Sequence, residues 1–198
     1  MKIIATCSIV AILLLSGCQS SADEGVEGSQ TENQVVDQVE DYTFEDYKAM
    51  FKDSVSEAEA FEVQEDNLEK WIARTIYQSK RNGNDNVKEE AVLEQAKEAL
   101  QQQEDRKRYA QETYGVQVTE EEVDRYIEEG PDQLDVMEQK AAAEAIGMTP
   151  EEFNHTYDRD HYEMAVLYEK LLPELRKKYD EVSDGNLIER FKEEVEKE

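Results

Sequence analysis

Residues 116–179 read VQVTEEEVDRYIEEGPDQLDVMEQKAAAEAIGMTPEEFNHTYDRDHYEMAVLYEKLLPELRKKY, and this stretch decides the fold. The same helix-start signal occurs in it twice, as Thr119 followed three positions later by Glu122 and as Thr149 followed by Glu152. In such a capping box the threonine side chain accepts a hydrogen bond from the N–H of the third helical residue, and the glutamate accepts one from the N–H of the threonine. The stretch therefore predicts helices that begin at Thr119 and Thr149.

Helix-breaking residues and the spacing of apolar residues predict how far the helices from Thr119 and Thr149 extend. The Gly130-Pro131 pair is expected to end the first helix, and a further helix is expected to begin near Asp132. The second is predicted to run from Pro150, at the helix position where proline is best tolerated, to about Tyr179. Apart from a polar gap at 158–160, its apolar residues recur at helical spacing as one seam. These residues are Phe153, Tyr157, Met164, Leu167, Tyr168, Leu171, Leu175 and Tyr179.

Further helical structure is predicted at the start of the folded part, and the sequence leaves open whether its first segment runs unbroken into the second. Thr43 and Asp46 repeat the start signal with Asp in place of Glu. A second helix is expected to be capped by Asp66 or Asn67 and to end at 82–86, where asparagine and glycine tolerate the left-handed conformation. Its apolar stripe, interpreted as core, comprises Leu68, Trp71, Ile72, Ile76 and Tyr77.

A long helix is predicted over 87–113, because this stretch is rich in good helix formers, lacks a breaker and is followed by Gly115. Residues 101–108 within it are all polar, so this half is expected to be thinly packed or exposed. A last short helix is expected after Ser183. No stretch alternates apolar and polar residues as a half-buried strand would, so the sequence predicts an all-α fold.

The N-terminal part of the chain indicates export. Within residues 1–17 lies an apolar run that is too short for an ordinary spanning helix and typical of a signal peptide. Leu15-Ser16-Gly17-Cys18 resembles the lipobox of bacterial lipoproteins, which implies cleavage before Cys18 and attachment of lipid, including palmitate, to that residue. The alternative is an ordinary signal peptide with a chance cysteine. Residues 18–41 are polar and are expected to be a disordered linker before a folded domain at 42–198.

Composition excludes several classes of protein. The formal charge of the 198-residue chain is −27, so its surface is expected to repel nucleic acid and anionic lipid headgroups. The same acidity also serves solubility, which is the simpler interpretation. Cys7 and Cys18 are the only cysteines, and loss of the signal would leave none for an intrachain disulfide. We therefore expect stability to come from helix packing.

The sequence predicts neither an enzyme nor a cofactor or metal site. His155 and His161 are the only histidines, and a separation of six residues places them on different helix faces, unable to share one metal ion. Asp158 is three residues from His161 and can pair with it, although a solvated helix face explains the pattern as well. The sequence has no glycine-rich phosphate loop and no Gly-x-Ser-x-Gly turn.

Aromatic residues and methionines are concentrated in the second half of the chain. Such side chains offer adaptable contact surface and suit a groove that binds unfolded or extended peptides. The alternative is that they are ordinary core and boundary residues of a helical bundle. The candidate peptide-binding residues are Tyr126, Met137, Phe153, Tyr157, Met164 and Tyr168.

The segments YGVQVTEEEVDRYIEE at 114–129 and AEAIGMTPEEFNHTYDRDHYEMAVLYEKLL at 143–172 resemble the N-terminal peptide-binding domain of SurA-type and PrsA-type exported foldases. In that family a long helix leads into a G-V-x-V-T-x-E-E-V start, and a G-M-T-x-E-E-F start leads into another. The resemblance covers roughly 91–179 and implies a helical SurA N-terminal-like domain. Members usually also carry a parvulin-type prolyl isomerase domain, which the residues after 191 are too few to form, so no isomerase activity is expected.

Together these features predict a lipid-anchored protein on the extracytoplasmic face of the bacterial cell membrane. The resemblance implies a chaperone-like function in which the chain binds unfolded or partly folded exported polypeptides, with the membrane contacted through the lipid on Cys18. The alternative of a different class is an envelope lipoprotein that binds one specific folded partner. In either case nucleic acid is not an expected partner.

Overall fold

A computed structural model describes residues 42–84, 86–180 and 183–198, so the predicted signal peptide at 1–17, Cys18 and the predicted linker at 18–41 lie outside the described residues. The described residues belong to one compact unit. They contain helices and no strand, which confirms the all-α prediction. In the same ranges, no helix has both the length and the apolar character that crossing a bilayer requires.

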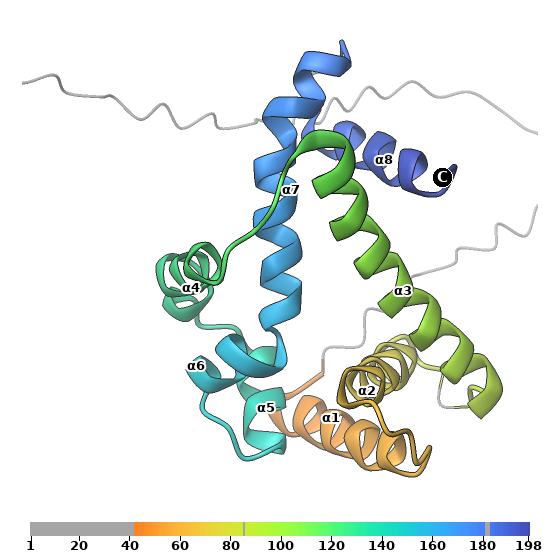
Figure 1. Cartoon of the computed structure of the whole chain (residues 1–198). Coiled ribbons are helices and arrows are strands. Elements are labelled where there is room, and N and C mark those ends of the chain that lie inside the picture. The colour runs from red at the N-terminus through yellow and green to blue at the C-terminus, as the bar shows by residue number, and fades with distance from the viewer. Residues whose placement is uncertain (1–41, 85, 181–182) are drawn as a thin grey trace, which may run out of the picture. The chain divides into compact units, whose positions relative to one another are not determined.

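The helices follow one another with short connections (Figure 1). Their bounds are α1 Phe44–Glu59, α2 Asp66–Arg81, α3 Glu89–Tyr114, α4 Glu120–Glu129, a 3-10 turn η1 Pro131–Gln133, α5 Met137–Ala145, α6 Pro150–Glu152, a π-helical turn η2 Phe153–Tyr157, α7 Arg159–Lys178 and α8 Asp184–Val195.

The predicted capping boxes are confirmed. Thr43, Thr119 and Thr149 cap α1, α4 and α6, and each makes both hydrogen bonds of the box. At Thr119, for example, the backbone N–H donates to Glu122 Oε2 over 2.8 Å, and the N–H of Glu122 donates to the threonine hydroxyl over 3.3 Å. Ser183 caps α8 through its side chain. The polar pattern of the sequence thus fixes four helix starts.

Two other helix starts differ from the prediction. Neither Asp66 nor Asn67 caps α2, because the chain is still extended at Glu65 and Asp66 is already helical. The helix expected near residue 132 begins only at Met137, because η1 and an extended stretch follow Gly130. At the other helix ends, Gly83 and Gly115 take positive φ angles of 72° and 67°, as expected for residues that terminate helices.

The predicted continuous helix from Pro150 to Tyr179 is interrupted. The turn η2 closes with a hydrogen bond from the N–H of Asp158 to the carbonyl of Phe153, which is one residue longer than an α-helical bond. Asp158 then leaves helical geometry, with φ −97° and ψ 3°, before α7 begins. The polar gap in the sequence marks this break.

The break divides the predicted seam between two packing centres. Phe153 packs with Phe51 of α1 and with two alanines of α5. The later seam residues of α7 pack instead against α3 and α8. These residues are Leu167, Leu171 and Leu175, and their buried neighbours include Ala110, Leu187 and Phe191.

Helix α3 connects the two ends of the folded part (Figure 1). Its first half packs against α1 and α2 through Val92 and Ala96, and its second half meets α7 and α8 at Ala110. The polar stretch between them is not simply exposed, contrary to the prediction. Gln103 is buried, and its side-chain amide donates to the carbonyl of Asp160 over 3.3 Å. A polar contact with α7 therefore replaces the apolar packing that the sequence lacks there.

A tyrosine cluster holds α8 in place. The carboxylate of Glu194 accepts hydrogen bonds from Tyr114, at 2.5 Å, from Tyr109, at 3.2 Å, and from Tyr179. Lys178 of α7 completes the cluster with an ion pair of 2.6 Å. Burial raises the pKa of Glu194, but the bonds from Lys178 and the tyrosines outweigh it and hold that pKa below its usual value. The carboxylate thus joins α3, α7 and α8.

Candidate binding site

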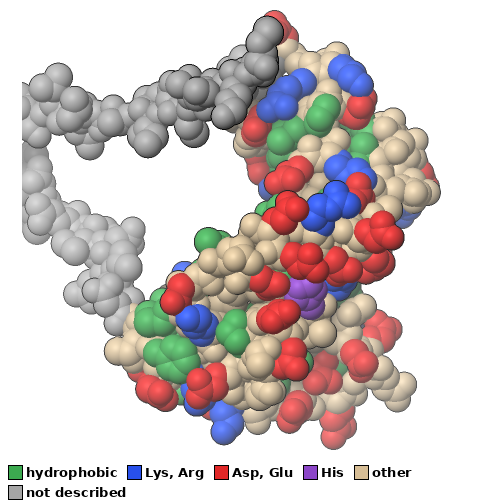
Figure 2. All heavy atoms as spheres, turned by 90° about the vertical axis from the view of Figure 1, so that its left-hand side faces the viewer, with side chains coloured by type: hydrophobic (Ala, Val, Ile, Leu, Met, Phe, Trp, Pro, Cys, Tyr) green, Lys and Arg blue, Asp and Glu red, His purple; other side chains and the backbone are tan. Residues whose placement is uncertain are grey.

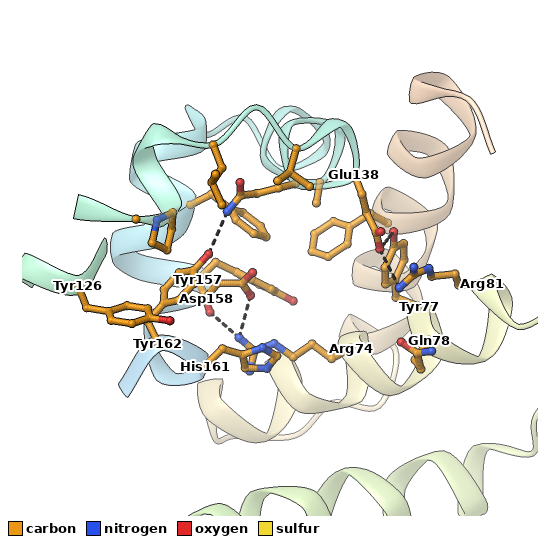
Figure 3. A pocket seen from close by; sticks show the side chains of 18 of the residues that line it. Arg74, Tyr77, Gln78, Arg81, Tyr126, Glu138, Tyr157, Asp158, His161 and Tyr162 are labelled. Carbon is orange, nitrogen blue, oxygen red and sulfur yellow. Dashed lines mark hydrogen bonds and ion pairs between the residues drawn. The ribbon is translucent and has the colours of Figure 1, made fainter. Parts of the chain in front are cut away.

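An open cavity of about 830 Å³ lies where α1, α2, the α4–α5 connection, α5 and the first turn of α7 come together (Figure 3). Residues far apart in the sequence contribute to it, and apolar and aromatic side chains form most of its wall. The lining residues are Phe51, Tyr77, Tyr126, Pro131, Leu134, Val136, Ala142, Phe153, Tyr157 and Tyr162, with Arg74, Gln78, Arg81, Glu129, Gly130, Glu138, Gln139, Asp158 and His161.

Four aromatic rings form one wall of the cavity. The ring of Phe51 lies 5.3 Å from that of Tyr77, 5.9 Å from Phe153 and 5.5 Å from Tyr157, each time edge to face. Phe153 and Tyr157 are stacked at 5.1 Å. These are favourable geometries for aromatic pairs, so the four rings pack against one another without a ligand.

Tyr126 and Tyr162 lie on the side opposite Tyr77 and Arg81 (Figure 3), with ring centroids 6.2 Å apart. The Tyr162 hydroxyl donates to Asn154 over 3.0 Å and accepts from Gln139 over 3.0 Å. Burial, followed by the nearby Asp158, raises the pKa of Tyr162 to about 12, so the phenol stays neutral.

The buried side-chain amide of Asn154 connects Tyr162 to Asp132. Asn154 is 1% exposed and donates to Asp132 over 2.8 Å, while the same carboxylate contacts His155 Nε2 at 3.1 Å. His155 is therefore engaged by acidic neighbours, which also include Asp124. The predicted separation of the two histidines holds, because His161 lines the cavity and His155 does not.

The one strongly buried cation of the cavity is already neutralised. Arg74 donates from Nη1 and Nη2 to Asp160 over 2.7 and 2.8 Å, and from Nη2 to the carbonyl of Tyr157 over 2.7 Å. Its Cζ atom also lies 5.1 Å from the ring centre of Trp71 and 5.3 Å from that of Tyr157. Both Nη atoms and the charge of Arg74 are paired, and only its buried Nε–H lacks a hydrogen-bond partner among the described residues. Arg74 is therefore a part of the wall and not a site for a ligand anion.

Tyr157 carries a buried hydroxyl without a hydrogen-bond partner among the described residues. Burial raises the pKa of this phenol well above its usual value, and the positive charge of Arg74 only partly opposes the effect. The side chain thus contributes its ring to the cavity and nothing through its oxygen.

Polar groups at the α2–α5 edge are paired with one another. Tyr77 donates to Glu138 over 2.8 Å, and Arg81 lies 3.3 Å from the same carboxylate. Burial and the adjacent Glu138 raise the pKa of Tyr77. The cavity therefore has no unpaired charge at this edge.

Two exposed apolar residues extend the cavity toward solvent. Leu134 is 62% exposed and Val136 is 42% exposed, and both belong to the lining. Exposed large apolar side chains on a soluble surface mark contact sites when they adjoin a cavity. Met137, at 47% exposed, follows directly but does not line the cavity.

The structure separates the six predicted binding residues. Tyr126, Phe153 and Tyr157 come together in the cavity. Met164 and Tyr168 pack instead against the core shared by α3, α7 and α8, on the far side of the helix break. The prediction missed the contribution of the first half of the chain, where the stripe that contains Tyr77 was interpreted as core and Phe51 was not among the candidates. Their spacing gave no signal that one edge of each ring faces a cavity.

The helices that begin at Thr119 and Thr149 do not form the cavity together with the long helix α3. The wall opposite α4 and α7 is α2, and none of the described residues of α3 lines the cavity.

The described residues hold no group of three or more His, Cys, Asp or Glu side chains arranged to hold a metal ion. Most of the cavity wall is apolar or aromatic and both arginines of the lining are paired, so the arrangement is suited to binding apolar side chains, with the unpaired Glu129 as the one acidic group left for a ligand among the described lining residues.

On the face shown in Figure 2, acidic side chains are spread over the surface with basic side chains between them.

No family model, curated protein or solved structure matches the chain.

Proposed function

We propose that the chain is a lipid-anchored, extracytoplasmic chaperone-like protein that binds unfolded or extended segments of exported polypeptides, without isomerase activity. The observation that carries the proposal is the open aromatic cavity continued by the exposed Leu134 and Val136. A volume of about 830 Å³ accommodates several side chains of an extended segment but no folded domain. A wall whose rings already pack against one another also reduces the entropy cost of ordering the site when a client binds.

The electrostatics of the cavity favour clients of mixed sequence. Arg74 is neutralised by Asp160, and Arg81 is paired with Glu138. The cavity thus selects mainly for apolar side chains, and the one lining carboxylate without a cationic partner among the described residues is Glu129. The net charge of −27 keeps the chain itself soluble while apolar residues are exposed. The lipobox ending at Cys18 would place this site beside the membrane across which clients emerge.

Suppression of aggregation tests the proposal directly. The chain from residue 19 onward, added to a denatured secreted protein during refolding, is expected to reduce light scattering in proportion to its concentration. The double variant Leu134→Ser, Val136→Ser removes apolar surface at the cavity without touching the core and should weaken suppression several-fold. Met137→Ser removes equally exposed apolar surface beside the cavity and should retain most of it. Equal losses in both variants, or no suppression at all, would contradict the proposal.

Crosslinking in cells separates this function from binding of one folded partner. A photoreactive amino acid at position 134 faces the cavity mouth and is expected to capture many unrelated exported chains, as smeared adducts of different mass. A single sharp adduct that forms equally well in cells with secretion blocked would instead identify a dedicated folded partner.

A further inference from the structure

A second hollow, of about 530 Å³, adjoins the cavity on the other side of α2. It lies between α2, the connection that follows it, and the first half of α3. Arg74, Gln78 and His161 line both hollows, so the two share a rim. The long helix α3, which contributes nothing to the aromatic cavity, lines this groove with Gln95 and Ala99.

The groove is unusual in its charge. None of the described residues that line it is acidic, in a chain with 49 aspartates and glutamates among 198 residues. Four carboxamide side chains line it instead, all of them exposed: Gln78, Asn82, Asn84 and Gln95. Within the described part of the chain, their side chains make a single hydrogen bond, from Gln78 to Asn82 over 3.3 Å. The groove therefore presents donors and acceptors that are free to bind a ligand.

A carboxamide offers the same pair of groups as a peptide bond, a donor N–H and an acceptor carbonyl. Several of them in one groove can pair with the backbone of an extended chain whatever its side chains are. Carboxylates at the same positions would attract basic segments and repel acidic ones. No carboxylate among the described lining residues imposes such a preference for client charge.

The junction between the two hollows is rigid. Arg74 is held by Asp160 and lies over Trp71, and the ring of His161 is 5.9 Å from that of Trp71. Burial and the positive charge of Arg74 lower the pKa of His161, so the junction adds no titrating charge near neutral pH. A ligand that crosses from one hollow to the other would pass along this fixed edge.

We propose that the carboxamide groove binds the backbone of the same extended client whose apolar side chains enter the aromatic cavity. This inference rests on the proposed function and specifies it. The client is recognised by two chemistries, the aromatic cavity for side chains and the carboxamides of α2 and α3 for peptide groups. Trp71, the only tryptophan of the chain, lines the groove and reports on its occupancy.

The test compares one peptide with its backbone-methylated form. The peptide is an uncharged ten-residue chain with two aromatic residues at one end and polar residues at the other. The second form carries N-methyl groups on the amides of the polar half, which removes donors and keeps the side chains. Titration against the chain from residue 19 onward is followed by Trp71 fluorescence and by anisotropy of a labelled peptide. We expect methylation to weaken binding about 10-fold, since each lost neutral hydrogen bond corresponds to about 2- to 10-fold in affinity.

The variant Gln78→Ala, Gln95→Ala supplies the matching change on the protein. Both positions are exposed and helical, where alanine preserves the helix. The double variant should bind the ordinary peptide about 5-fold more weakly than the parent protein does. This affinity should be close to that of the parent for the methylated peptide, because the protein variant and the methylation remove the same hydrogen bonds. Gln111→Ala, an exposed glutamine of α3 outside the groove, is the matched control and should bind like the parent.

The outcomes separate this inference from the proposed function. If the ordinary and methylated peptides bind alike and the double variant changes neither, the groove inference is overturned while peptide binding in the cavity stands. If neither peptide binds and Trp71 emission is unchanged at all concentrations, the proposed function itself fails, and the groove inference with it.

Discussion

Arg74 of α2 and Asp160 of α7 form a two-pronged ion pair, with Nη1 2.7 Å from Oδ2 and Nη2 2.8 Å from Oδ1. Lys70 lies 3.0 Å from the same carboxylate. The side chain of Arg74 is 11% exposed and that of Asp160 is 18% exposed, so solvent screens the pair only weakly. This contact fixes α2 to the first turn of α7 and thereby sets the distance between the two sides of the cavity.

Replacing Arg74 by alanine is expected to destabilise the fold by about 3 kcal/mol or more, because a weakly exposed carboxylate loses its main partner. Urea unfolding followed by circular dichroism measures the change in free energy of unfolding. Arg108→Ala removes a 55% exposed arginine that pairs with Asp105 within α3, and should cost less than about 1 kcal/mol. Equal losses in the two variants would show that the Arg74 pair contributes no more than a surface one.

The same pair predicts how stability depends on pH. Burial raises the pKa of Asp160, but the hydrogen bonds and charge of Arg74, with Lys70, outweigh it and hold that pKa far below the usual 3.8. The unfolded chain therefore takes up this proton at a higher pH than the folded chain. The contribution, on the order of 2 kcal/mol, is fully present above about pH 4 and is lost as pH falls through the folded pKa.

Unfolding by urea at pH 7 and at pH 3 checks this dependence. Asp160→Asn cannot titrate, so its stability should fall less between the two pH values than that of the parent. A parallel fall in both proteins would mean that other carboxylates account for the acid sensitivity.

Removing the hydroxyl of Tyr157 should be harmless. This oxygen is buried without a partner, so Tyr157→Phe removes a desolvated polar atom and leaves the ring that stacks on Phe153. The expected change lies between no effect and a gain of about 1 kcal/mol in the free energy of unfolding. Tyr162→Phe is the comparison, since it loses bonds to Asn154 and Gln139 and should cost about 1 kcal/mol. A larger loss at Tyr157 than at Tyr162 would contradict the assignment.

The cluster at Glu194 predicts local opening of α8. Glu194→Gln removes the charge that Lys178 and three tyrosine hydroxyls face, and we expect a loss of about 1–3 kcal/mol. Hydrogen exchange measured by mass spectrometry should rise in 184–195 before it rises in α1 or α2. Glu193→Gln, at an adjacent exposed position, is the control. Unchanged exchange in α8 would show that its buried Leu187 and Phe191 hold it without the cluster.

The lipobox predicts the location of the chain. Cys18→Ser removes the residue to which lipid would be attached, so the protein should move from the membrane fraction to the aqueous fraction after cell lysis. Detergent partitioning of the parent and the variant measures this shift. A variant that still partitions with the membrane would contradict anchoring through Cys18.

Helix starts were predictable because they depend on a few neighbouring residues. The boxes at Thr119 and Thr149 need only a threonine and a glutamate three residues later, and the structure places both as predicted. The end of α3 was predictable in the same way, since Gly115 takes the left-handed conformation that glycine permits.

The cavity was not predictable, because it depends on contacts between distant segments. Phe51 and Phe153 are about a hundred positions apart in the chain, and nothing local to either indicates that their rings meet. Met164 and Tyr168 share helical spacing with Phe153 and were grouped with it for that reason. The π turn places them on a different core, and the polar residues 158–160 were its only trace in the sequence.

The π turn at Phe153–Tyr157 limits where the chain can gain or lose residues. In an unbroken α-helix, residues 153 and 171 would share a face, since 18 residues make about five full turns. Here Phe153 contacts α1 and α5, while Leu171 contacts α3 and α8. The extra residue of the π turn and the break at Asp158 therefore make the two residues face different neighbours. Inserting or deleting one residue within α7, between 159 and 170, would rotate the side chains downstream of the change by about 100° relative to those before it and leave one of the two centres facing polar side chains. Length variation should therefore be excluded between Phe153 and Leu171, which are buried in two different clusters.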